Sequence, residues 1–123
     1  MIKKISIAMS VSFMLLATGC AQRIGDFTLV SSKNIDLSKG ADFKRASTRV
    51  KAIDSVPIIL GFPVGLPDMK TALDHAIEQT PGAVALADGV IIRKEFDFIL
   101  FGQLSYEVEG TPLIDPTVQK SYK

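Results

Sequence analysis

The stretch Pro67–Ala87, PDMKTALDHAIEQTPGAVALA, decides the fold. Apolar residues recur in it at intervals of three and four, the period of a helix with one buried face; they are Met69, Ala72, Leu73, Ala76 and Ile77. Asp68 can cap the first turn, and Pro81-Gly82 ends the helix. The small residues at 83–87 allow a helix to approach a strand closely. This stretch therefore predicts one helix packed on a sheet.

Alternating apolar and polar residues on either side of that stretch predict the strands. The clearest is 103–109, in which apolar Leu104, Tyr106 and Val108 alternate with Gln103, Ser105, Glu107 and Glu109. We expect further strands at 27–30, 47–56 and 90–93, while 94–100 forms either a hairpin connection or strand ends. Asn34–Arg45, rich in turn formers and charge, predicts a surface loop. The predicted fold class is α+β, a small antiparallel sheet of about four strands packed against one main helix.

The first twenty residues have the pattern of an export signal. Lys3 and Lys4 precede an apolar run at 5–17, which is followed by small residues and then by Cys20. A run of about 13 residues rises about 20 Å as a helix, which is too short for a bilayer core of about 30 Å. The pattern therefore favours a cleaved signal peptide over a permanent transmembrane helix.

The segment Leu16-Ala17-Thr18-Gly19-Cys20 resembles the lipobox of bacterial lipoproteins. The resemblance implies that the Cys20 thiol receives a diacylglycerol group, that the peptide bond between Gly19 and Cys20 is cleaved, and that further acyl chains such as palmitate anchor the protein. Ala17 stands where leucine is commonest in this motif. Ala17 and Gly19 would also suit the ordinary signal peptidase, which would release a soluble protein with a free thiol. Ala21, where aspartate would retain a lipoprotein at the inner membrane, implies the periplasmic face of the outer membrane in a two-membrane cell.

These observations divide the chain into four parts. We expect a signal peptide at 1–19, a lipidated N-terminus with a short tether at 20–26, one α+β domain at 27–112 and a mobile tail at 113–123. The chain has 14 basic and 13 acidic residues, so no strong field draws it to nucleic acid. Its single cysteine excludes an internal disulfide.

The segment Pro57–Pro67 has neither a charged nor a polar side chain, and its prolines and glycines prevent a regular helix. Two interpretations are open. The segment either folds back over the core and covers a sheet edge, or it is exposed and contacts a partner or the acyl region of a membrane. The second interpretation makes contact residues of Ile59, Phe62, Val64 and Leu66, together with Phe96 and Phe98 from an aromatic cluster that also includes Phe101.

Catalytic patterns are missing from the sequence. His75 is the only histidine, and a zinc site needs more ligands than one histidine without a free cysteine can supply. Two pairs of acids, Glu95 with Asp97 and Glu107 with Glu109, have the spacing that places carboxylates on one strand face, where we expect a solvated surface. We therefore predict no catalytic residue, no metal and no cofactor other than the covalent lipid.

The sequence thus predicts a lipid-anchored protein of the cell envelope with a non-enzymatic binding or structural role, acting by contact with another envelope protein. One alternative is a carrier that holds a lipid or another apolar ligand between helix and sheet. Another is an exclusion lipoprotein of the prophage or plasmid type, which blocks an outer-membrane receptor.

Overall fold

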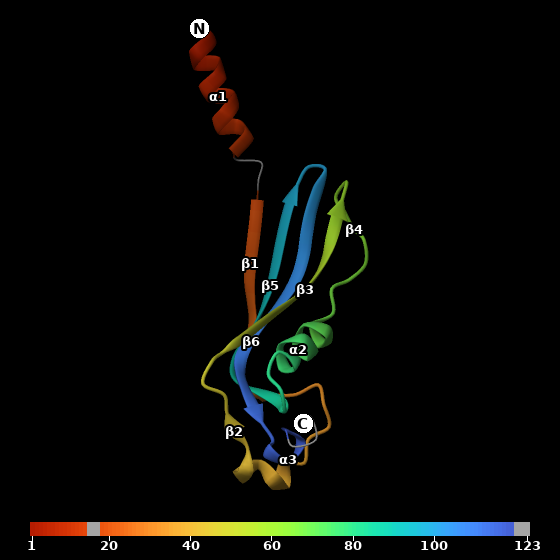
Figure 1. Ribbon diagram of the computed structural model, residues 1–123. Helices are drawn as coiled ribbons and strands as arrows, with labels where there is room; N and C mark the ends of the chain where they lie inside the picture. The colour runs from red at the N-terminus through yellow and green to blue at the C-terminus, as the bar shows by residue number, and fades with distance from the viewer. Residues whose placement is uncertain (15–17, 120–123) are drawn as a thin grey trace.

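A computed structural model of the protein describes residues 1–14 and 18–119. Within these residues the chain forms one antiparallel sheet of six strands with short helices around it (Figure 1). The strands are β1 Thr18–Val30, β2 Lys44–Arg45, β3 Val50–Ile59, β4 Phe62–Pro63, β5 Ala83–Phe98 and β6 Phe101–Ile114. The helices are α1 Ile2–Met14, the 3-10 helix η1 Leu37–Asp42, α2 Met69–Glu78 and α3 Pro116–Gln119. The sheet order is β1-β5-β6-β3-β4, and β2 pairs with the far end of β6.

The predicted fold class was wrong. The sheet has six strands among the described residues rather than about four, and small helices accompany it rather than one main helix. Asp88-Gly89, a dipeptide typical of turns, is a bulge inside the single long strand β5, where Asp88 has a φ of 49°. Gly110-Thr111-Pro112, residues that commonly end strands, lies within β6. The sheet is larger because long-range pairing carries the strands through these local turn signals.

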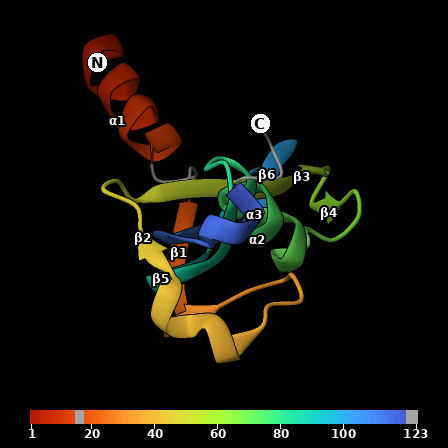
Figure 2. The same cartoon turned by 60° about the horizontal axis from the view of Figure 1, so that its bottom comes forward.

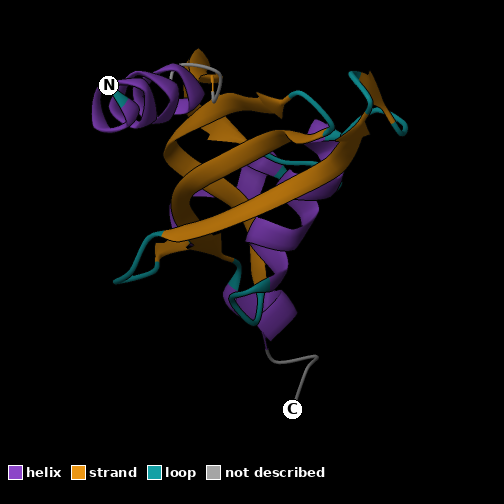
Figure 3. Cartoon of the chain, turned by 90° about the horizontal axis from the view of Figure 1, so that it is seen from above, coloured by secondary structure: helices purple, strands orange, loops and turns teal. Residues whose placement is uncertain are grey.

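Helix α2 forms where the sequence places it. The Asp68 side chain caps it by accepting a hydrogen bond from the Lys70 backbone N–H at 2.8 Å. Ala72, Ala76 and Ile77 are fully buried against the sheet. Seen from above, α2 lies along one face of the twisted strands (Figure 3), and this face holds the hydrophobic core.

Strand β1 includes the residues expected as a tether. Positions 20–26 pair with β5 from Glu95 to Val90, so the fold continues up to the cysteine. The end of the chain differs in the same way from the expected tail. Residues 113 and 114 complete β6, and α3 follows at Pro116–Gln119, while 120–123 lie outside the described residues.

The long strands give the sheet two distinct ends. The β5–β6 turn, the β3–β4 turn and the start of β1 lie at one end, and α1 lies beyond that same end (Figure 1). The opposite end carries η1, β2 and α3, which Figure 2 brings forward. The predicted contact residues and Cys20 therefore belong to the same end of the molecule.

Candidate functional site

Cys20 is an exposed free cysteine near the beginning of the edge strand β1. It pairs with Glu95 of β5, and Gly19 pairs with Phe96. A Cβ at position 19 would lie 3.6 Å from the Phe96 ring, an ordinary van der Waals contact, so this position lies directly beside that ring. Leu16 and Ala17, the first two residues of the lipobox pattern, lie outside the described residues. The thiol of Cys20 is thus accessible at the end of the sheet.

Two hairpin turns stand side by side at this end. Ile59 of β3 pairs with Phe101 of β6, and the Leu60 N–H donates to the Leu100 carbonyl at 2.9 Å. The rings of Phe98 and Phe101 pack at a centroid distance of 5.6 Å. The pairing therefore makes one unit of two segments that lie about 40 residues apart in the sequence.

The segment Pro57–Pro67 combines features of both interpretations. It folds back into the short hairpin β3–β4, in which the Val64 N–H donates to the Pro57 carbonyl at 2.8 Å, and Ile58 and Pro67 are buried. Its other apolar side chains point outward, and those of Phe62 and Leu66 are 76% and 82% exposed.

Exposed apolar residues gather at this end into a surface that we name the apolar tip. Its members are Ile59, Leu60, Phe62, Val64, Leu66, Phe96, Ile99, Leu100 and Phe101. Five of the six predicted contact residues are members of this tip, and the sixth, Phe98, is half-buried at the same end. The other four members, Leu60, Ile99, Leu100 and Phe101, were not among the predicted contact residues. The sequence signal for Ile99 and Leu100 was an uncharged run at 98–102 directly before the clearest strand.

A shallow cavity of about 420 Å³ lies beside the tip, on the face opposite α2. It is lined by Ser55, Pro57, Phe96, Phe101, Gly102 and Gln103. Two aromatic rings form its wall, and one hydroxyl and one amide are its polar side-chain groups. Such a lining suits an apolar group rather than a reacting substrate.

Three of the four acids in the two predicted pairs, Glu95, Glu107 and Glu109, are bound to cations, whereas the Oδ1 of the fourth, Asp97, is buried without a hydrogen-bond partner within the described ranges. Glu95 accepts from Arg93 at 3.0 Å, and Glu109 accepts from Arg49 at 2.9 Å. Glu107 was expected on a solvated face, but it is only 3% exposed because neighbouring side chains cover it.

Glu107 is held between two lysines. The Lys94 Nζ lies at 2.6 Å and the Lys51 Nζ at 3.4 Å from its carboxylate oxygens. Burial raises the pKa of Glu107, but the hydrogen bonds and charges of the two lysines outweigh burial and hold the pKa below its ordinary value of 4.5. The group is therefore a charged, structurally paired carboxylate at neutral pH, and it is not poised to exchange protons there.

His75 is exposed on α2. In the described part of the chain no three histidine, cysteine or acidic side chains cluster in a way that could hold a metal ion.

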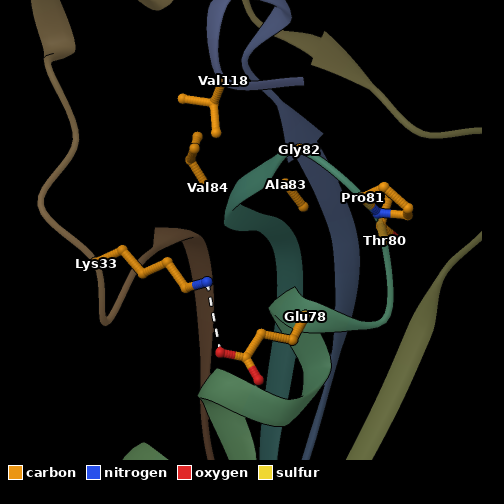
Figure 4. Close-up of a pocket in the computed structure, with 8 residues that line it drawn as sticks. All are labelled: Lys33, Glu78, Thr80, Pro81, Gly82, Ala83, Val84 and Val118. Atoms are coloured by element: carbon orange, nitrogen blue, oxygen red, sulfur yellow. Dashed lines mark ion pairs between the residues drawn. The ribbon is translucent and has the colours of Figure 1, made fainter. Parts of the chain in front are cut away.

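A second cavity, of about 310 Å³, lies toward the opposite end between α2 and the start of β5 (Figure 4). Lys33 and Glu78 pair across it at 3.6 Å, and Thr80, Pro81, Gly82, Ala83, Val84 and Val118 complete the lining. Its only charged groups neutralise each other, so the cavity presents no set of unpaired polar groups that would orient a substrate.

No described helix is both long and apolar enough to cross a membrane. Comparisons of this chain with protein-family models, with curated proteins and with solved structures find no match.

Proposed function

We propose that this chain is a lipid-anchored protein of the cell envelope with a binding or structural role and no catalytic one. One observation carries the proposal: the lipobox cysteine, Cys20, is exposed at the end of an edge strand, beside the apolar tip. A cysteine that must receive a lipid has to be accessible, and its acyl chains have to reach a membrane without crossing the protein. Both conditions are met at this end of the sheet.

The modification would leave the fold intact. The diacylglyceryl group would be joined to the Cys20 Sγ as a thioether, and cleavage would remove α1 together with Thr18 and Gly19. The β1–β5 pairing from Cys20 with Glu95 to Val30 with Leu86 would remain. Several acyl chains at about 0.8 kcal/mol per buried methylene give stable anchoring. Ala21 supports the outer membrane as the destination.

A non-catalytic role is supported by the state of the charged groups. Glu95, Glu107 and Glu109 are paired with lysine or arginine, and the exposed His75 lines neither of the two cavities described above. A general acid or base needs an orienting partner within a cleft that can hold the substrate.

The carrier alternative has less support. The space between α2 and the sheet is closely packed, with Ala72, Ala76 and Ile77 on the helix and Leu86 and Val108 on the strands fully buried. The cavity beside the tip is open and shallow, and a carrier needs to enclose most of its ligand.

The test is lipid labelling in bacterial cells that express the full chain. We expect an alkyne analogue of palmitate to label the protein, and we expect the label to disappear in Cys20→Ser. Ala21→Asp is the matched control, because it keeps the lipidated cysteine and should keep the label while moving the protein to the inner membrane. An unlabelled wild-type protein released into the periplasm would refute the proposal and support cleavage by the ordinary signal peptidase.

A further inference from the structure

We infer that the apolar tip inserts into the acyl region of the leaflet that holds the lipid on Cys20, so that the protein is attached to the membrane at two points. This inference rests on the proposed lipid anchor and goes beyond it. The anchor fixes one atom near the bilayer, whereas insertion of the tip would also fix how the domain stands on it.

The distances along the strands place the tip at membrane depth. Cys20 pairs with Glu95, and the β5–β6 turn begins four residues later at Ile99. Four strand residues at about 3.4 Å each extend about 14 Å. The tip therefore projects beyond Cys20 on the side where α1 also lies (Figure 1). With Cys20 at the boundary between headgroups and acyl chains, a tip of this length reaches the acyl region, where interfacial segments bury about 5–10 Å.

The turn residues keep the tip apolar at a cost in backbone strain. Leu60 and Gly61 both have positive φ, of 52° and 80°, a geometry in which hairpins prefer Asn-Gly. Ile99 has a φ of 27° at the first position of a two-residue turn, where glycine is the usual choice. A β-branched residue at positive φ is strained. Polar or glycine turns would be more stable in water, so the apolar residues point to an environment that favours them.

Charge is distributed as a membrane boundary requires. Neither 57–67 nor 98–102 contains a charged residue. Counted from the turn, β5 has a single charged residue, Asp97, before Glu95 and Lys94, which are level with Cys20 and Ala21. Asp97 is half-buried, and its Oδ1 is buried without a hydrogen-bond partner among the described residues. The change from charged to apolar surface thus falls at the level of the lipidated residue.

Several backbone N–H groups in the two segments that form the tip are missing or already paired, and an unpaired one would be costly to bring out of water. Pro57, Pro63 and Pro67 have none. The Leu60 N–H donates to the Leu100 carbonyl of the other hairpin, and the Val64 N–H donates to the Pro57 carbonyl of its own.

A lipid surface fits this tip better than a protein partner does. Stable protein interfaces bury about 800 Å² on each partner and have a polar rim. The tip is instead two narrow turns that project beyond Cys20. The proposed anchor would hold them next to acyl chains permanently, whereas a protein partner would have to displace those lipids.

The test uses the mature lipidated protein, in which the thioether occupies the only native cysteine. Phe62→Cys and Leu100→Cys provide single thiols on the two turns, and Leu37→Cys provides the matched control on η1, at the opposite end and 66% exposed. Each is labelled with the environment-sensitive fluorophore NBD and reconstituted in vesicles of phosphatidylethanolamine and phosphatidylglycerol. Circular dichroism confirms that each labelled variant is folded.

We expect the labels at 62 and 100 to brighten several-fold, shift to the blue and be quenched by lipids with a nitroxide on the acyl chain. The label at 37 should behave as it does in water. If the labels at 62 and 100 match that at 37, the inference is wrong even when palmitate labelling has confirmed the anchor. The same holds if a photo-crosslinker at position 62 captures a protein in cells while the reconstituted tip remains in water. Absence of palmitate labelling would instead refute the proposed function.

Discussion

Replacement of Gly89 by alanine tests the contact that holds the edge strand β1 against the sheet. Gly89 pairs with Phe27 of β1, at the bulge in β5. An added Cβ would overlap the Phe27 ring, whose Cε2 would be only 2.6 Å away, and would also collide with the backbone oxygen of Glu109. The ring can rotate away, but the Glu109 backbone belongs to the neighbouring strand β6. The substitution must therefore move both a core side chain and a strand.

The cost follows from these two contacts. Overpacking of a filled site costs about 1–3 kcal/mol. Phe27 packs against the core, and displacement of a ring of this size loses part of the roughly 1.5–3 kcal/mol that its burial contributes. We expect G89A to lower the free energy of unfolding by about 2–4 kcal/mol, which for a domain of this size lowers Tm by roughly 10–25 °C.

The assay is thermal unfolding of the mature protein in a mild detergent, followed by the circular dichroism of its strands. Gly25→Ala is the matched control on β1, because nothing lies within 4 Å of a Cβ added there; we expect it to change stability by less than about 0.5 kcal/mol. The double variant F27L/G89A should lose less stability from the alanine than the wild-type background does. If G89A melts within about 4 °C of the wild type, the Phe27 ring is not seated on Gly89 and the argument fails.

Two further substitutions test the ion pairs of Glu107 and the cap of helix α2. Glu107→Gln should lower the free energy of unfolding by about 1–2 kcal/mol at pH 7. The loss is smaller than two fully buried charged hydrogen bonds would give, because Lys94 and Lys51 are half exposed and water screens them. The pKa of Glu107 is lowered in the folded state, so the stabilisation by its carboxylate is complete above pH 4.5 and is lost as the pH falls through the lowered folded-state pKa. Urea unfolding at pH 7 and pH 3 should therefore show that the stability difference between Glu107→Gln and the wild type shrinks in acid. A stability difference that stays constant would contradict the pairing. Asp68→Ala removes the cap that accepts the Lys70 N–H and should cost about 1 kcal/mol in the same urea assay, whereas Asp68→Asn, which can still cap, should stay close to the wild type.

Helix α2 could be predicted from the sequence because its determinants are local. Its apolar period, its cap at Asp68 and its end before Pro81-Gly82 all lie within 15 residues. The alternation in 103–109 predicts burial only in part. Leu104 and Val108 are buried as expected, but Ser105 and Glu107, expected on the outward face, are buried as well.

The sheet could not be predicted to the same extent because its pairing is long-range. Strand β1 contains Arg23, Gly25 and Asp26, which have weak strand preference, and it forms because the whole length of β5 pairs with it. Glu107 was expected in water, but two lysines from neighbouring strands make its burial tolerable. Pairs of this kind depend on the register, which one strand alone does not specify.

The structure places the predicted contact residues at one end of the sheet. The sequence did not indicate that Cys20 lies at this same end. The apolar character of Pro57–Pro67 was evident, whereas the turn at Ile99-Leu100 lacks the glycine or asparagine by which such turns are recognised. Whether the two segments meet depends on the pairing of Ile59 with Phe101, a contact between residues about 40 positions apart.

The absence of a tether gives the proposed anchor a consequence that a flexible linker would not. If the lipid is joined to Cys20, the first mature residue is already paired within the sheet, so a tilt of the domain must either break that pairing or move the apolar tip relative to the lipids. From Glu95, level with Cys20, back to Ala83, the strand β5 spans about 40 Å at about 3.4 Å per residue. A domain standing on its tip would hold η1 and β2 at about that height above the leaflet, whereas a domain lying flat would bring the charged face of β1 to the headgroups and leave the tip in water. The upright orientation is the one that removes the exposed apolar side chains from water while the lysine and arginine pairs stay hydrated.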